Sequence, residues 1–122
     1  MEISSMAEVF LPFRSFRVLV GFSGGADSTA VLLLAEHFAK KIGFELTAVH
    51  FNHHLRGEEA DSEAEKAAEF ALKRGINFHK EDIYPAPGNG VEARAREERL
   101  KVWKRLCAGD PRSVVMLGHH AD

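Results

Sequence analysis

A short loop with two consecutive glycines separates an apolar run from an apolar helical stretch near the start of the chain. The run covers residues 16–22, the loop Ser-Gly-Gly-Ala-Asp-Ser covers 23–28, and the helical stretch covers 29–39. The run predicts a buried parallel strand. Glycine backbone and the free N–H groups of a helix N-terminus together favour an anion, so this strand, loop and helix predict a phosphate site.

An aspartate stands where the best-known phosphate loop has a lysine. A Walker A loop ends in Gly-Lys-Ser/Thr, whereas this loop ends in Asp27 and Ser28. A carboxylate beside phosphate repels the anion unless a divalent cation lies between them, so Asp27 suggests Mg²⁺. The alternative is an ordinary glycine turn in which Asp27 is the N-cap of the helix. The loop alone leaves both interpretations open.

Composition limits the architecture and the classes of partner. The chain has 122 residues, 45% hydrophobic and 28% charged, which suits one globular domain, and we assign 1–15 to an N-terminal segment and 16–122 to the domain. Formal net charge is -2, so any contact with RNA has to be local. The single cysteine, Cys107, can form neither an intramolecular disulfide nor a thiolate cluster, which favours a cytoplasmic location. Neither a secretory signal nor a membrane span is predicted.

Strand and helix patterns alternate along the whole chain. After the first strand and its helix, which stops at Gly43, strands are predicted at 44–50, 76–83 and 113–117, and helices at 60–74 and 91–108. This alternation predicts an α/β fold, a Rossmann-like parallel sheet with helices on both faces. The chain ends directly after the fourth strand, so we expect the sheet to lack its last strand or strands.

Polar clusters follow three of the predicted strands, at 23–28, 50–56 and 119–122. Ligands of parallel sheets bind at the carboxyl ends of the strands, so these clusters should meet in one cleft. Alternation places His50 and Asn52 on one side of their strand, where they could frame a nucleotide base, while Arg56 could neutralise phosphate. The alternatives here are a histidine metal site, whose spacing fits no common zinc pattern, and a merely solvated loop.

Two further segments carry candidate functional groups. His119 and Asp122 could place a cation, a nucleotide or a proton acceptor, or could simply cap a loop. Glu92, Arg96 and Arg99 share one face of the third predicted helix, which could hold a triphosphate or RNA at the cleft or could face solvent. On the same helix, core contacts are predicted for three apolar side chains, those of Val102, Trp103 and Leu106.

Four segments in register resemble one known family. Residues 23–28 resemble the Ser-Gly-Gly-x-Asp-Ser signature of the PP-loop ATP pyrophosphatases, which cleave ATP between the α and β phosphates. Segments 50–61, 92–99 and 118–122 resemble, within that family, the tRNA(Ile)-lysidine synthetases. The sequence departs from them in having Leu100 where Tyr is frequent and in ending within a motif that usually continues Asp-Gln.

The resemblance implies a PP-loop, or adenine nucleotide alpha hydrolase-like, fold and a ligase that forms a C–N bond. ATP would adenylate the wobble cytidine of isoleucine tRNA with release of pyrophosphate, and free lysine would then displace AMP to give lysidine. The implied cofactors are ATP and Mg²⁺, and the implied partners are isoleucine tRNA and free lysine, with a homodimer left open.

The resemblance also assigns roles to individual residues. Nucleotide and pyrophosphate binding falls to Ser23, Gly24, Gly25, Ala26, Asp27, Ser28, His50, Asn52 and Arg56. Catalytic roles fall to Asp27, Arg96, His119 and Asp122, of which Asp27 and Asp122 would hold Mg²⁺. The alternatives are another PP-loop enzyme, of the tRNA thiolation or amidotransferase type, and a nucleotide-binding fragment without turnover. We expect the 122 residues alone to bind ATP and Mg²⁺ weakly and to make no lysidine.

Overall fold

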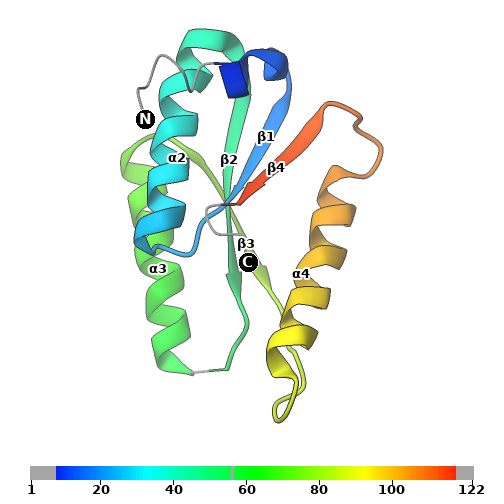
Figure 1. Cartoon of the computed structure of the whole chain (residues 1–122). Coiled ribbons are helices and arrows are strands. Elements are labelled where there is room, and N and C mark those ends of the chain that lie inside the picture. The colour runs from blue at the N-terminus through cyan, green and yellow to red at the C-terminus, as the bar shows by residue number, and fades with distance from the viewer. Residues whose placement is uncertain (1–7, 56, 118–122) are drawn as a thin grey trace.

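The computed structural model describes residues 8–55 and 57–117, and within these ranges it forms a single parallel sheet in the order β3-β2-β1-β4. The strands are β1 (Arg17–Gly21), β2 (Glu45–Asn52), β3 (Asn77–Asp82) and β4 (Ser113–Leu117). The helices are α2 (Ala26–Phe38), α3 (Glu58–Lys73) and α4 (Val91–Cys107), with a 3₁₀ turn at Leu11–Phe13 and a π-helical turn at Ala39–Gly43. Figure 1 shows α2 and α3 on one face of the sheet and α4 on the other.

The parallel pairing confirms the predicted fold class. In the register of β1, Gly21 lies opposite Val49 of β2 and Leu117 of β4. All four strands therefore end at the same edge of the sheet, as the argument from strand alternation requires. No helix in the described ranges has the length and apolar content needed to cross a membrane.

The predicted and observed bounds of the strands differ mainly where a strand ends in polar residues. β4 covers the predicted residues, but β2 continues two residues past His50 to Asn52 because it is paired there with β3, Asn52 lying opposite Asp82. The backbone N–H of Ile83 also donates to the Asn52 carbonyl at 2.9 Å. Polar side chains at the end of β2 therefore remain in the strand, since the neighbouring strand satisfies their backbone.

The larger core lies between the sheet and the pair of helices α2 and α3. Val18 and Val20 of β1 and Leu32 of α2 are fully buried there. The buried face of α3 consists of small side chains, which let the helix approach the sheet closely: Ala60, Ala64, Ala67 and Ala71 are buried.

Helix α4 is held by a smaller core and a few long side chains. The Trp103 ring packs edge-to-face on Phe51 of β2, with centroids 5.1 Å apart. The Glu81 carboxylate of β3 accepts from Arg105 of α4 at 2.8 Å and from the His79 ring at 2.6 Å. These contacts fix which face of α4 looks toward the sheet.

We expect Glu81→Gln to reduce stability most at neutral pH. Burial raises the pKa of Glu81, but hydrogen bonds from His79 and Arg105, with their charges, outweigh it, so its pKa lies below the usual 4.5. A depressed carboxyl pKa contributes stability above the unfolded pKa, and this contribution is lost as pH falls through the folded pKa. Urea unfolding of both proteins should therefore give a larger difference at pH 7 than below pH 4.5.

Glu98→Gln is the matched control, because the Glu98 carboxylate also pairs with a cation, Lys101, but does so on the exposed surface of α4. This change should alter stability by less than about 0.5 kcal/mol at either pH. An equal loss for Glu81→Gln at both pH values would contradict the role of its carboxylate charge.

Candidate active site at the carboxyl edge of the sheet

Hydroxyl groups close the loop between β1 and α2. The Ser28 hydroxyl is buried, accepts from the Ser23 backbone N–H at 3.1 Å and lies 3.0 Å from the Ser23 hydroxyl. The Ser23 hydroxyl in turn accepts from the Gly25 N–H at 3.2 Å. Both serines therefore shape the loop itself, in addition to the phosphate contacts predicted for them.

The N-terminus of α2 opens toward this loop without a side-chain cap. Gly25 is the N-cap residue and has no side chain to accept from the first-turn N–H groups, so the helix has no side-chain capping hydrogen bond. The alternative interpretation of Asp27 as the N-cap is therefore wrong: Asp27 lies in the first turn and is exposed. The first-turn N–H groups, which include that of Ala26, and the positive end of the helix dipole remain for an anion, so the residues present fit a phosphate group.

Gly24 gives the loop its curvature. Its φ of +94° is one that side-chain-bearing residues rarely adopt, and the space around its Cβ position is open to 4 Å. The concave side of the loop is thus lined by backbone, which lets a phosphate approach the N–H groups closely.

His50 supports the loop from the neighbouring strand. Its side chain is 4% exposed, and its Nδ1 lies 2.9 Å from the carbonyl oxygen of Phe22, the residue directly before the loop. A carbonyl oxygen only accepts, so Nδ1 carries the proton in this contact. His50 therefore lies against the start of the loop, and the nucleotide contact predicted for it stays a prediction.

Asn52 lies away from the phosphate loop and organises the segment that follows β2. Its Nδ2 donates to the Asp61 carboxylate at 2.9 Å, and its Oδ1 accepts from the His54 backbone N–H at 3.0 Å. Asn52 is buried and lines a separate hollow between α3 and β3. The structure therefore does not bring Asn52 to the same cavity as His50.

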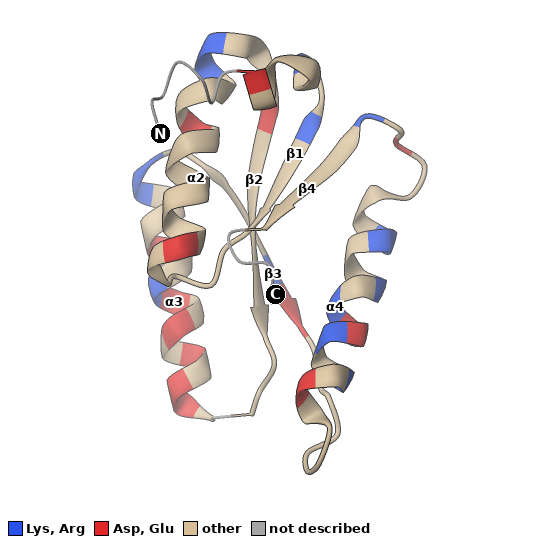
Figure 2. Ribbon diagram, viewed as in Figure 1, with Lys and Arg blue, Asp and Glu red and all other residues tan. Residues whose placement is uncertain are grey.

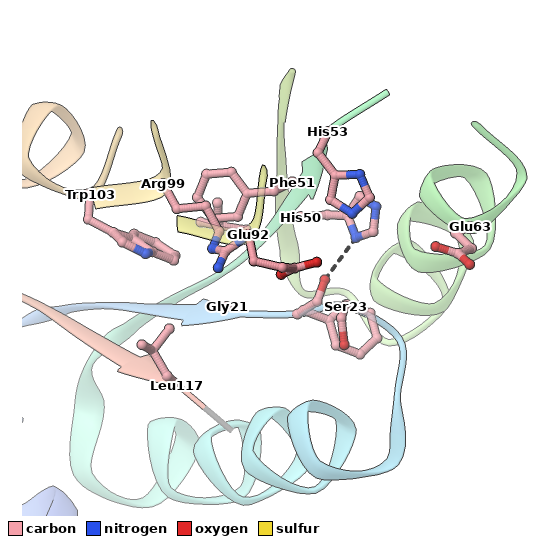
Figure 3. Close-up of a pocket in the computed structure, with 12 residues that line it drawn as sticks. Gly21, Ser23, His50, Phe51, His53, Glu63, Glu92, Arg99, Trp103 and Leu117 are labelled. Atoms are coloured by element: carbon pink, nitrogen blue, oxygen red, sulfur yellow. Dashed lines mark hydrogen bonds between the residues drawn. The ribbon is translucent and has the colours of Figure 1, made fainter. Parts of the chain in front are cut away.

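A cavity of about 280 Å³ adjoins the phosphate loop (Figure 3). Helix α4 contributes Glu92, Arg99 and Trp103 on one side, and Glu63 of α3 lies across the cavity from them. The lining residues come from three strands, two loops and two helices: Gly21, Phe22, Ser23, Val49, His50, Phe51, His53, Glu63, Glu92, Arg99, Trp103 and Leu117.

Gly21 sets how closely the apolar wall approaches the strand. A Cβ at this position would lie 3.0 Å from Cδ2 of Leu117 and 3.4 Å from the Trp103 ring. The first distance is too short for an undistorted contact, so a larger residue would displace Leu117 or narrow the cavity.

Of the three charged residues predicted on one face of α4, two line the cavity and one does not. Glu92 and Arg99 line the cavity, whereas Arg96 is exposed and lies outside its lining. Trp103, predicted as a core contact, packs on Phe51 and also lines the cavity. Glu63 was not found from the sequence because only the packing of α3 brings it to this edge.

The remaining predicted site residues, Arg56, His119 and Asp122, lie outside the described residues. Within the described part of the chain, no group of three or more His, Cys, Asp or Glu side chains is placed to hold a metal ion, so the histidine metal site has no structural support. Mg²⁺ commonly takes one or two carboxylates together with phosphate oxygens and water. The exposed Asp27 beside a phosphate-binding loop fits that mode of binding.

The fold and the loop together define an α/β protein with a strand, loop and helix arranged to bind phosphate. Residues 2–122 match the family described as the PP-loop domain, and the chain belongs to this family. The recognition made from the loop sequence is thereby confirmed. Use of ATP by this family implies an ATP site in the chain.

Curated relatives with the most similar sequences include several tRNA(Ile)-lysidine synthases. The protein from Solibacter usitatus is 38% identical over 104 residues, 84% of this chain and 22% of that protein. The protein from Enterococcus faecalis is 34% identical over 108 residues, 86% of this chain and 23% of that protein. The chain thus spans between a fifth and a quarter of the length of these relatives.

A solved structure with the same fold is the U34-tRNA thiolase NcsA from Methanococcus maripaludis with its [4Fe-4S] cluster. The TM-score is 0.72 at 20% sequence identity, over 96% of this chain and 45% of that one. At this identity the similarity establishes the fold alone.

We expect Gly24→Ala to weaken binding of inorganic pyrophosphate in Mg²⁺, measured by calorimetry, by about tenfold or more, because it disturbs backbone N–H donors to a charged ligand. Gly88→Ala is the matched control, since Gly88 also has a positive φ, +106°, with open space at its Cβ position. Both changes should destabilise the fold by about 1–2 kcal/mol. Equal pyrophosphate affinity for the two variants would contradict the phosphate-binding role of the loop.

Proposed function

We propose that this chain is the ATP-binding part of a tRNA(Ile)-lysidine synthase, a cytoplasmic ligase that converts the wobble cytidine of isoleucine tRNA to lysidine. The observation that carries the proposal is the meeting of an uncapped helix end, an aspartate and a mixed polar and apolar cavity at one sheet edge. Relatives at 30–38% identity over most of this chain bear the name of that enzyme, which supports the choice of reaction.

In the first step, the carbonyl oxygen of cytidine attacks the α-phosphorus of ATP, and the bond from this phosphorus to pyrophosphate breaks. The loop N–H groups and the α2 N-terminus stabilise the charge that develops on the leaving pyrophosphate. Bound Mg²⁺ would supply further positive charge to the phosphate oxygens, held by Asp27 and, in the proposal, by Asp122. In the second step, the amine of free lysine attacks the activated ring carbon, loses a proton and displaces AMP.

The cavity residues would orient the reactants. Arg99 offers a planar cation within the cavity and Glu92 a carboxylate on the same wall, so the two suit a negatively charged group and an amine, respectively. The resemblance implies further roles in the cleft, which we propose as well: nucleotide binding for Arg56 and catalysis for Arg96 and His119. A homodimer likewise remains a proposal.

Two other functions give different outcomes in the same assays. A tRNA thiolase of the kind that carries a [4Fe-4S] cluster needs several cysteine thiolates, and these 122 residues contain one, Cys107 on α4. Nucleotide binding without turnover would give ATP affinity but no change in the tRNA.

The reaction is tested with a chimaera in which residues 1–122 replace the matching segment of the Enterococcus faecalis relative. After incubation with ATP, Mg²⁺, lysine and an isoleucine tRNA transcript, mass spectrometry should detect lysidine at the wobble position. The parent enzyme and a thermal unfolding curve are the controls. A folded chimaera that binds ATP but leaves the tRNA unmodified would contradict the proposed reaction.

The proposed Mg²⁺ role is tested on the chain itself with Asp27→Ala. We expect ATP affinity in Mg²⁺ to fall by about tenfold or more, because a charged ligand of the cation is lost, and the difference between Mg²⁺ and EDTA to disappear. Glu58→Ala is the matched control, since Glu58 is also an exposed acid in a first helical turn, that of α3. Unchanged Mg²⁺ dependence in calorimetry of Asp27→Ala would count against this role.

A further inference from the structure

Two aromatic rings lie flat against each other at the outer end of the same sheet edge. The His54 ring stacks on Tyr84 with centroids 4.6 Å apart and planes 8° from parallel. Tyr84 is 73% exposed. The rings follow β2 and β3, whose last residues, Asn52 and Asp82, lie opposite each other in the ladder. The ring pair is thus on the edge that holds the phosphate loop, outside the cavity.

One hydrogen bond to its ring and one to its backbone hold His54 in place. Its Nε2 lies 2.8 Å from the Asp82 carboxylate, and its backbone N–H donates to Asn52. Asn52 is itself fixed by Asp61. His54 has a φ of +54°, a sterically costly conformation for a residue with a side chain, and the structure retains it. A ring fixed in this way loses little conformational freedom when a ligand stacks on the pair.

Cationic side chains lie close to the segments that carry the rings. The Asp82 carboxylate, which is hydrogen-bonded to the His54 ring, also has the Lys80 ammonium 4.0 Å away. Arg94 of α4 donates at 2.9 Å to the Ala86 carbonyl, in the loop that begins directly after Tyr84. Flat rings with nearby cations are the chemistry that binds unpaired bases in single-stranded nucleic acid.

We propose that the His54–Tyr84 ring pair is a stacking platform for an unpaired RNA base beside the reactive site. The proposal rests on the proposed function, in which the RNA is the anticodon loop of a tRNA. Base stacking needs no extended basic surface, so a chain with a formal net charge of -2 can bind an unpaired base in this way. It also assigns a use to an exposed tyrosine that the ATP site does not employ.

The chain provides separate reporters for the platform and for the cavity. Tyr84 is its single tyrosine and Trp103, in the cavity wall, its single tryptophan. With fluorotyrosine incorporated, the fluorine NMR signal of Tyr84 should shift on addition of an RNA hairpin with the loop sequence of an isoleucine anticodon arm. A fully paired duplex of similar length should shift it far less. ATP with Mg²⁺ should move the indole N–H signal of Trp103.

Substitutions give the affinity test, read by hairpin titration. Tyr84→Leu should weaken hairpin binding by about 5- to 150-fold, the range for loss of one base stack, and Tyr84→Phe should stay within about twofold of wild type because it keeps the ring. Leu72→Ala is the matched control, because Leu72 is a similarly exposed apolar residue, 70% exposed, in the last turn of α3.

The outcomes separate this inference from the proposed function. A Tyr84 signal that the hairpin does not move, an equal response to the duplex, or unchanged affinity of Tyr84→Leu would overturn the platform. A Trp103 signal unaffected by ATP, together with a Tyr84 signal that responds to the hairpin, would instead argue against the ATP site and support the platform.

Discussion

The backbone pairing of β1 with β2 on one side and β4 on the other determines where the functional groups lie. Because all the strands run in parallel, the phosphate loop, the end of β2 and the end of β4 meet at one edge. Gly21 ends β1 at the centre of this arrangement and has no side chain, so Leu117 and Trp103 approach its backbone directly. Beyond this sheet edge, the polar character of the cavity depends on what α3 and α4 contribute from either side. Figure 2 shows that these contributions differ in charge, with many acidic residues on α3 and mixed charges on α4.

Most of the fold was predictable because its strands and helices carry strong, short-range patterns. β4 has the predicted bounds, and α3 begins and ends within two residues of its predicted bounds. The predictions failed where the backbone depends on a neighbour. The end of β2 is polar and looks like a loop in the sequence, yet its ladder with β3 keeps Asn52 in the strand. For α2, where the sequence left an N-cap role of Asp27 open, the structure has Gly25 as the N-cap, because the loop conformation decides where the helix begins.

The candidate site was predictable in part, for a related reason. Glycines followed by a helix identify the phosphate loop, since both features act locally. Helical spacing groups Glu92, Arg96 and Arg99 on one face but does not fix the rotation of the helix about its axis. That rotation is fixed by Trp103 on Phe51 and by the pairing of Arg105 with Glu81, and it turns Arg99 toward the cavity. Strand alternation likewise gives the face on which Asn52 lies, but it does not show that the first turn of the following helix supplies Asp61 as the partner of its amide.

The central position of β1 also has a consequence for the order in which the site is built during folding. β1, the phosphate loop, α2 and β2 are contiguous in sequence, so their pairing closes a short segment of chain at small entropic cost. The partner of β1 on the other side is β4, and Arg17 meets Ser113 across 96 residues of sequence. Contacts of such high sequence separation are slow to form. The phosphate loop is therefore expected to be complete while the wall that carries Trp103 and Leu117 is still unformed, so the two halves of one binding site have separate folding histories.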